Sequence, residues 1–304
     1  PTHTLVESYG DGWAWSVPLS PQLRYVTAMV DPQRTALARG GPAADVYGAE
    51  LGKAQHLAAL MRSSVLERGP WGYDASVYSA HTFAADPLLL VGDAASFADP
   101  LSSYGIKKAL ASAWLAAVAA HTSLRRPERT TAALAFFGAR EAAMSASLVR
   151  QSRVLFEDAA SAHAHLFWTD RAADIEVPAA GEPDVRALGD DPRVQEAFGW
   201  LKAQEALALR PARALRREPS PIVRGHEIVM EERLVADGCA DGLRFLRDVD
   251  LMGLLALAPA HDQVPALFES YNRRFPPVAL PDFLGALSVM IAFGLLEDSR
   301  ASAG

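Results

Sequence analysis

Cysteine is almost absent from this chain: its 304 residues contain one, Cys239. A single cysteine excludes an intrachain disulfide, and it excludes zinc or iron–sulfur sites built from several cysteines. Half of the residues are hydrophobic, so a chain of this length can bury a large core and form one or two domains. We expect a globular protein located in the cytoplasm.

Long apolar runs and an excess of positive charge are also lacking. The uncharged run at 283–296 is shorter than the roughly 20 residues that span a bilayer, and no basic start with an apolar signal core is present. Lys and Arg number 29 against 36 Asp and Glu, which gives a net charge of −7. We therefore expect no membrane span and no nucleic-acid partner, because nucleic-acid binding normally needs a basic surface.

The most informative segment is an apolar run at 88–91 that ends in Gly92-Asp93-Ala94. A continuous apolar run is typical of a central parallel strand, whose two faces are both covered. Ligands bind at the carboxyl ends of such strands, so we expect Asp93 to accept hydrogen bonds from ligand hydroxyls there. Pro100 and Gly105 frame the next turn, and an alanine-rich helix is predicted from about 104 to 121. The N–H groups at the start of this helix can hold a negatively charged group.

Two tryptophans, Trp13 and Trp15, stand two residues apart in a segment typical of a β-strand. Alternate residues of a strand share a face, so both indoles should line one wall. The turn residues before them and the run at 24–30 after them predict a hairpin or meander. Large aromatic residues often only fill the core beside a sheet, and that interpretation stands beside a role at a substrate site.

Together these segments resemble the superfamily of FAD-dependent monooxygenases and halogenases. The spacing Phe97-x-x-Pro100-x-x-Ser103-x-Gly105 is similar to that of the halogenase subgroup, and Trp13-x-Trp15-x-Val17-Pro18 is similar to its WxWxIP signature. The resemblance implies that FAD is the cofactor and that an antiparallel substrate sheet belongs to a partial glutathione-reductase-like fold of the α+β or α/β class. It implies cofactor contacts at Gly92, Asp93, Ala94, Pro100, Gly105 and Ile106, and substrate contacts at Trp13, Trp15 and Ser103.

One part of the family pattern is missing from this sequence. Members begin with a strand, a GxGxxG phosphate loop and a helix, and no such pattern occurs here. The missing half would also carry the lysine that halogenases use, so we assign no catalytic residue. Because the chain opens with Pro1 rather than Met, we expect it to be the carboxyl-terminal portion of a longer flavoprotein.

Composition changes along the chain predict three parts. Residues 1–175 would form a partial FAD and substrate domain, 176–221 a linker with a short helix, and 222–304 a small winged-helix-like domain. This last part holds seven Arg and no Lys against twelve acidic residues, so DNA binding is disfavoured and docking of a peptide or carrier protein is favoured. That role rests on fold analogy alone.

Local patterns predict further elements. Helices are expected at 45–66, 130–161 and 193–209, a strand at 73–83 that joins the tryptophan sheet, and breaks at 175–192 and 210–221. In the last domain, Asp250 and the segment Leu280-Pro281-Asp282 are expected at helix starts. His163 and His165 are expected to pack or cap rather than bind a metal. Lys107 and Lys108 oppose a helix dipole, so either both extend into water or one faces an anion near Ser103 and Tyr104.

These observations leave three functions open. The first is an FAD-dependent halogenase or monooxygenase that acts on an aromatic or electron-rich substrate, either a small molecule or one tethered to a carrier. Its partners would be the missing FAD-binding segment or a flavin reductase. The second is a non-catalytic binding module or subunit that needs a separate FAD-binding half. The third is a flavin-dependent reductase of double bonds, which gives no reason for the tryptophan pair.

Overall fold

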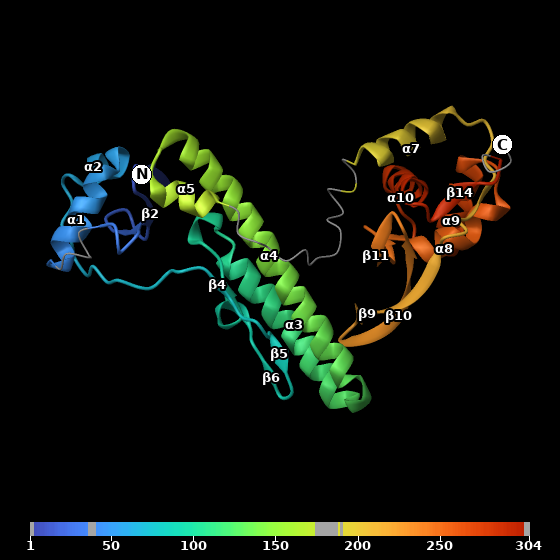
Figure 1. Ribbon diagram of the computed structural model, residues 1–304, viewed down its shortest axis with the longest axis horizontal. Helices are drawn as coiled ribbons and strands as arrows, with labels where there is room; N and C mark the ends of the chain where they lie inside the picture. Colours follow the sequence, from blue (N-terminus) through green and yellow to red (C-terminus); the bar gives the residue numbers. More distant parts are fainter. Residues whose placement is uncertain (1–2, 36–40, 174–187, 189–190, 301–304) are drawn as a thin grey trace. The chain divides into compact units, whose positions relative to one another are not determined.

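A computed structural model describes residues 3–35, 41–173, 188 and 191–300 (Figure 1). The chain folds as two compact units, and each unit is built from three separate segments of the sequence. The first comprises 1–83, 90–113 and 141–179, and the second comprises 84–89, 114–140 and 180–304. Helices are mixed with strands in both units, and every strand pair in the described part of the chain is antiparallel. The expectation of a mixed fold with antiparallel strands is confirmed.

A three-stranded sheet organises the amino-terminal end of the first unit. Its strands are β1 (Leu5–Tyr9), β2 (Gly12–Pro18) and β3 (Arg24–Val30), in the order β1-β2-β3. This is the predicted meander. Trp13 lies opposite Met29 and Trp15 opposite Thr27 in the register of β2 and β3. A Cβ atom at Gly12 would lie 2.6 Å from the Met29 carbonyl oxygen, so only glycine allows this close turn.

The two faces of this sheet pack on different helices. Ala14 and Tyr9 face α1 (Ala43–Lys53) and α2 (Gln55–Met61), whereas Trp13 faces the aromatic cluster of α4 (Thr130–Ala162) and α5 (Leu166–Ala172). The single helix predicted at 45–66 is divided, because Ala54 adopts an extended conformation. The Glu7 carboxylate then accepts hydrogen bonds from the backbone N–H groups of His56 and Leu57 at the start of α2.

Two strand predictions are wrong. The predicted central strand at 88–91 contains only β6 (Leu88–Leu89), which forms a hairpin with β5 (Ala84–Ala85). Leu88 is 59% exposed, and the described residues offer this segment no parallel strand that would cover it. The predicted strand at 73–83 contains only β4 (Tyr78–Ser79), which pairs with β7 (Ser96–Phe97) instead of joining the tryptophan sheet.

Long helices follow these hairpins. The predicted helix start is confirmed by α3 (Gly105–Arg125), and the predicted helix at 130–161 is confirmed by α4. One helix, at 127–162, is long and apolar enough to cross a membrane by length and composition, and 39% of its most apolar window is buried. A core helix of a soluble protein passes the same test, so the expectation of no membrane span stays a prediction.

The second unit has one large apolar core. Leu234, Leu254 and Phe283 are among its fully buried side chains. Asp250 caps the first helix after the strands, and Asp282 lies in the first turn of the last helix, as predicted. Its carboxyl-terminal elements are α7 (Pro192–Ala203), β8 (Leu209–Pro211), β9 (Arg216–Arg224), β10 (Glu227–Ala236), β11 (Cys239–Leu243), β12 (Phe245–Leu246), β13 (Val249–Asp250), α8 (Leu251–Leu257), α9 (Val264–Arg274), α10 (Leu280–Ala292) and β14 (Leu296–Asp298).

The predicted break at 210–221 is also wrong. It contains the end of β8, which pairs with β14, and most of β9, which pairs with β10. Charged and proline residues stand on this strand because most of its side chains are exposed or half-buried. The predicted break at 175–192 falls almost entirely outside the described residues. The short helix predicted at 193–209 is present as α7, but it ends at Ala203, before the predicted end. The domain boundaries near 175 and 221 stay predictions.

Candidate functional site

The Gly92-Asp93-Ala94 segment forms a tight turn instead of the end of a long strand. It is a single turn of 3-10 helix, and Gly92 has a positive φ of 59°. The Gly92 N–H donates to the buried Ser112 hydroxyl of α3 at 3.0 Å. A Cβ atom at Gly92 would lie 3.3 Å from the Cβ atom of Ala109. Glycine is needed here by both backbone conformation and space, so the turn packs tightly on α3.

Asp93 presents its carboxylate to solvent from this turn. Its side chain is 62% exposed, and one carboxylate oxygen lies 3.7 Å from the Lys108 ammonium. The Tyr78 hydroxyl donates to the Asp93 carbonyl oxygen, so the backbone is held while the side chain stays accessible. An exposed carboxylate on a fixed turn can accept hydrogen bonds from hydroxyl groups of a ligand.

The second half of the motif places an open helix start beside the turn. Asp99 caps a short 3-10 turn at Pro100–Ser102 by accepting from the Leu101 N–H at 2.9 Å, and burial raises the pKa of its carboxyl. Ser103 adopts a left-handed conformation with φ 56°. Gly105 is exposed and Ile106 is 81% exposed at the first turn of α3. The first N–H groups of a helix have no partner within it and can therefore receive a ligand.

The two lysines of that turn differ from both predicted outcomes. Lys107 is exposed and lies over the Tyr104 ring, with 5.4 Å between ammonium and centroid. Lys108 is buried, and its ammonium donates to the carbonyl oxygens of Gly92 and Ser96. Burial lowers the pKa of Lys108, while the carboxylates of Asp93 and Glu141 act in the opposite direction. Lys108 therefore does not extend into water, and it forms its ion pair with the Asp93 carboxylate of the turn.

Trp13 and Trp15 form the predicted aromatic pair on one face of β2. Their ring centroids are 5.0 Å apart with an interplanar angle of 31°. Trp13 is 2% exposed and packs with Phe156, Phe167 and Trp168, whereas Trp15 is only half-buried. The Trp168 indole N–H donates to the Tyr9 carbonyl oxygen at 2.8 Å and ties α5 to the sheet. Trp13 thus fills the core, and Trp15 is the member of the pair that a ligand can reach.

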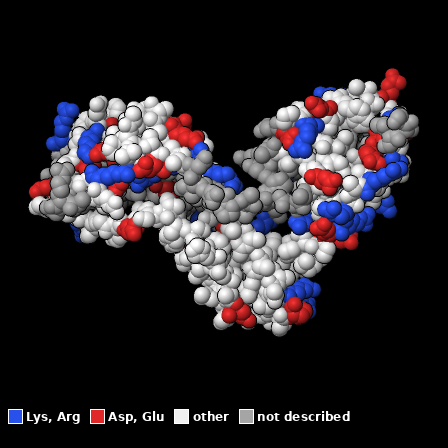
Figure 2. Space-filling view, in the orientation of Figure 1, with Lys and Arg blue, Asp and Glu red and all other residues white. Residues whose placement is uncertain are grey.

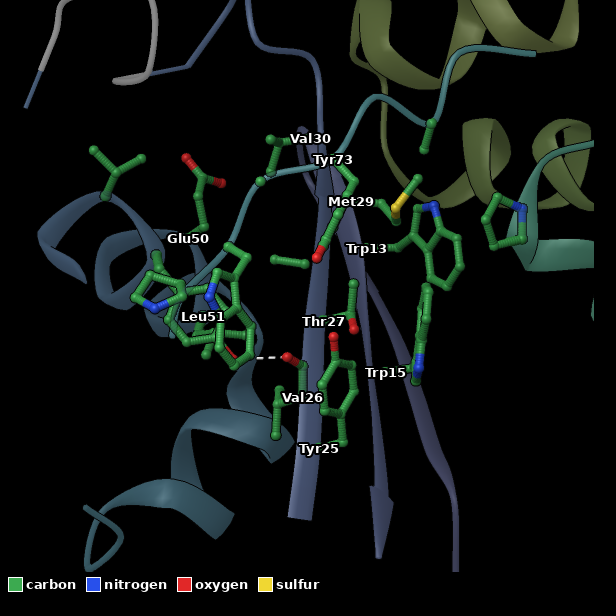
Figure 3. Close-up of a pocket in the computed structure, with 18 of the residues that line it drawn as sticks. Trp13, Trp15, Tyr25, Val26, Thr27, Met29, Val30, Glu50, Leu51 and Tyr73 are labelled. Carbon is green, nitrogen blue, oxygen red and sulfur yellow. Dashed lines mark hydrogen bonds between the residues drawn. The ribbon is translucent and has the colours of Figure 1, made fainter. Parts of the chain in front are cut away.

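A cavity of about 2290 Å³ lies within the first unit and brings parts of both motifs together. It is far larger than the roughly 300–1,000 Å³ of a typical small-molecule site. Figure 3 shows Trp13 and Trp15 projecting to the same side, with Met29 beside Trp13. Both tryptophans and Pro100 line the cavity. The other predicted contacts, Gly92, Asp93, Ala94, Ser103, Gly105 and Ile106, are not part of its lining.

His163 and His165 have the structural roles that were expected. His165 precedes α5 and its Nδ1 atom accepts from the Phe167 N–H at 3.1 Å. The His163 ring stacks on Trp168 with 6.0 Å between centroids, and its Nε2 atom is 3.1 Å from the Ser8 hydroxyl. Packing and capping therefore account for both rings.

Sequence reasoning missed two residues around the turn, Tyr78 and Glu141, and it singled out Lys108 without predicting its burial or its backbone partners. Tyr78 reaches the Asp93 carbonyl from β4, a contact between residues that no local motif joins. Glu141 on α4 is 1% exposed, and burial raises the pKa of its carboxyl against the influence of Ser112 and Lys108. One signal was available, because a lysine in the first turn of a helix is unfavourable and so indicates a compensating partner.

Comparison with known proteins gives structural likeness without a family match. No protein-family model matches the chain, and no curated protein matches it. The crystal structure of CmlS, a flavin-dependent halogenase, matches 98% of the chain with a TM-score of 0.68 and 19% identity. The peptidyl tryptophan dihydroxylase QhpG, essential for tryptophylquinone cofactor biogenesis, matches 88% with a TM-score of 0.59 and 24% identity.

These two likenesses establish the fold. The chain shares, over most of its length, the fold of the matched part of a flavin-dependent halogenase and of a tryptophan dihydroxylase. It spans 60% of the length of the first and 56% of the length of the second. A third, the myxobacterial chondrochloren halogenase CndH, has 25% identity over 66% of this chain and 44% of its own, with a TM-score of 0.49.

Proposed function

We propose that this chain is part of an FAD-dependent oxidoreductase of the halogenase and monooxygenase type. One observation carries the proposal: the exposed Asp93 carboxylate stands on a glycine turn that packs against α3, within a fold shared with a flavin-dependent halogenase. Asp93 would accept hydrogen bonds from hydroxyl groups of the cofactor. The backbone at Gly105 and Ile106 would face its electron-accepting ring, where a positive helix end favours developing negative charge.

The turn and the helix start offer the kinds of groups that bind a flavin, an exposed carboxylate and exposed first residues of a helix. Asp93 and Ala94 are exposed at the turn, whereas Gly92 is buried against α3. Pro100 with Ser103 shapes the approach to the helix start. When bound and reduced, FAD would supply the activation of dioxygen. The chain's own part would be to orient the cofactor and to present an aromatic or electron-rich substrate near Trp15.

Two related reactions on the substrate are compatible with this proposal, halogenation and hydroxylation. The halogenase neighbour and the dihydroxylase neighbour share this fold, so halogenation and hydroxylation both suit it. The size of the cavity favours a substrate that is large or tethered to a carrier protein, and a flavin reductase would be a partner. A requirement for halide during turnover distinguishes the two, since hydroxylation needs none. We further propose that the protein acts in the cytoplasm and that 222–304 is a winged-helix-like docking domain.

A second candidate is a binding subunit that needs a separate FAD-binding half. It is favoured by an apolar stripe on α3, where Ile106, Leu110 and Trp114 are 81%, 68% and 57% exposed. Figure 2 shows few charged side chains on the visible face of the α3–α4 helical hairpin. Exposed apolar surface of this kind marks an interaction site. A double-bond reductase remains the third candidate, and nothing in the tryptophan pair supports it.

Flavin retention tests the proposal directly. We expect the purified chain, or a version extended upstream of residue 1, to gain the visible absorbance band of flavin after incubation with FAD and removal of the excess. Asp93→Asn should weaken FAD binding by about tenfold, which corresponds to about 1.4 kcal/mol. Asp158→Asn is the matched control, because Asp158 is an exposed acid on α4 away from the turn.

The outcomes separate the candidates. Flavin in the chain alone, or only in the extended version, supports the oxidoreductase. A chain that stays colourless but binds a separate protein carrying the phosphate loop supports the subunit. If neither version retains flavin, or if Asp93→Asn binds FAD as tightly as Asp158→Asn, the proposed role of this turn is wrong.

A further inference from the structure

Lys108 is a buried cation at a place where positive charge is disfavoured. It lies in the first turn of α3, and its side chain is 2% exposed. The positive end of the helix dipole opposes a cation there. An ammonium group removed from water also loses its hydration and is retained only with close polar partners. The partners of its ammonium therefore indicate which part of the structure Lys108 stabilises.

The contacts of Lys108 are concentrated on the Gly92-Asp93-Ala94 turn. Its ammonium donates to the Gly92 carbonyl oxygen at 3.0 Å and to the Ser96 carbonyl oxygen. It also lies 3.7 Å from a carboxylate oxygen of Asp93. A single point charge thus ties together the two ends of the segment 92–96 and faces the one acid between them. Hydrogen bonds from an ionised donor are stronger than neutral ones, so this segment is held firmly.

A second buried titratable group, Glu141, interacts with the lysine from the neighbouring helix. Glu141 of α4 is 1% exposed, and neither carboxylate oxygen has a hydrogen-bond partner among the described residues. Lys108 is the cation that interacts with it electrostatically. The ammonium therefore interacts with two acids, the exposed Asp93 of the turn at 3.7 Å and the buried Glu141 of α4 through electrostatics. The turn is therefore connected to α3 by the hydrogen bonds of a charged donor as well as by the packing of Gly92 on Ala109.

We propose that Lys108 is a positioning residue that holds the 92–96 turn and the Asp93 carboxylate in the arrangement that receives the flavin. The inference rests on the proposed function, since it assigns Lys108 to the same turn. Lys108 acts through Asp93 and the turn backbone and does not touch the cofactor. Lys107, one residue earlier, is exposed and lies over the Tyr104 ring instead of contacting the turn backbone in the described part of the chain, so the chain contains its own matched control.

The experiment compares Lys108→Met with Lys107→Met in the form of the protein that retains flavin. The first readout is amide hydrogen exchange without cofactor at Ala94 and Ala95, whose N–H groups donate to the carbonyl oxygens of Val91 and Gly92. We expect Lys108→Met to speed this exchange by about tenfold, because the turn opens more easily without its charged donor. Lys107→Met should leave it unchanged.

The second readout is FAD affinity in a double-mutant cycle with Asp93→Asn. We expect Lys108→Met to weaken FAD binding by about tenfold, and the double variant to lose less than the product of the two single losses. Such non-additivity shows that Lys108 acts through Asp93. Circular dichroism and cooperative unfolding check that the variants are folded. Lys108→Gln, which keeps a neutral NH2 donor group, serves where the methionine variant is unfolded.

Each outcome decides the inference. Unchanged exchange at Ala94 and Ala95, or an FAD affinity equal to that of Lys107→Met, overturns it and leaves the proposed function standing. Multiplicative losses in the cycle overturn it as well, because Lys108 would then support the fold without acting on Asp93. If the unaltered protein binds no FAD in either version, the proposed function and this inference fail together.

Discussion

Residues 3–173 and residues 191–300 differ in how many of their large apolar side chains are exposed to solvent. Of the 22 large apolar side chains that are exposed in the described part of the chain, nineteen belong to 3–173 and three to 191–300. The later region instead has one continuous core with fully buried leucine and phenylalanine side chains. Its apolar residues are accounted for by folding alone, whereas many of those in the earlier region are available for a ligand or partner.

The same contrast holds for buried polar atoms. Buried side-chain polar atoms without a hydrogen-bond partner occur in seven described residues, and six of these lie in 3–173. They include Tyr9, Trp13 and Glu141. Buried polar groups are normally paired, and those that are not concentrate at functional or strained sites. The region that carries both sequence motifs is therefore also the region with more unpaired buried polar atoms. This agrees with a binding site for a ligand or a partner protein in that region.

The largest expected effect is the loss of stability caused by substituting Trp13. It tests whether residues 3–173 contain a tightly packed core. Trp13→Ala removes a fully packed indole from the cluster with Phe156 and Trp168. We expect a loss of about 3–5 kcal/mol in the free energy of unfolding, measured by urea denaturation. Trp15→Ala, at the half-buried partner, should cost clearly less and should change ligand binding in the cavity. Equal losses at both positions would mean that the pair is only packing.

A leucine in each region gives the sharpest comparison. Leu254 of α8 is 0% exposed, and Leu110 of α3 is 68% exposed. We expect Leu254→Ala to lower the free energy of unfolding by about 2–5 kcal/mol, because a cavity remains in the core. Leu110→Ala should change it by no more than about 0.5 kcal/mol, as at other surface positions. A large loss at Leu110 would show that the stripe on α3 is already covered in the isolated chain.

Sequence patterns predicted elements that are decided by local chemistry. The alternation around Trp13 and Trp15 marked a strand with one apolar wall, and Asp250 before an apolar run marked a helix start. Gly105 before an alanine-rich stretch marked the start of α3. In each instance neighbouring residues supply the interaction that fixes the conformation, so the pattern and the structure agree.

The errors occurred where distant residues decide the outcome. An apolar run such as that at 88–91 becomes a central strand only if strands pair with it on both sides, and the described residues provide only an antiparallel turn partner. The burial of Lys108 depends on the carbonyl oxygens of Gly92 and Ser96 and on Glu141 of another helix. No residue spacing in the sequence predicts such contacts between distant residues. The candidate site was therefore predictable as a motif, but not its supporting charges.

The smallest expected effect is the pH dependence caused by Glu141. Burial raises the pKa of this carboxyl in the folded protein, so the folded state holds the proton more tightly than the unfolded state does. The contribution of Glu141 to stability is then fully present below the ordinary pKa of glutamate and is lost as the pH rises through the raised value. One proton changes stability by at most about 1.4 kcal/mol per pH unit.

Glu141→Gln removes this titration and leaves a neutral side chain of nearly the same shape. We therefore expect the stability of the variant, relative to the unaltered chain, to increase from pH 4 to pH 7 in urea denaturation series. Glu196→Gln, at an exposed position of α7 in the later region, should follow the unaltered chain throughout. If Glu141→Gln shows the same pH dependence of stability as the unaltered chain, Lys108 fully compensates the burial of this acid. The regions 3–173 and 191–300 would then not differ in uncompensated buried charge.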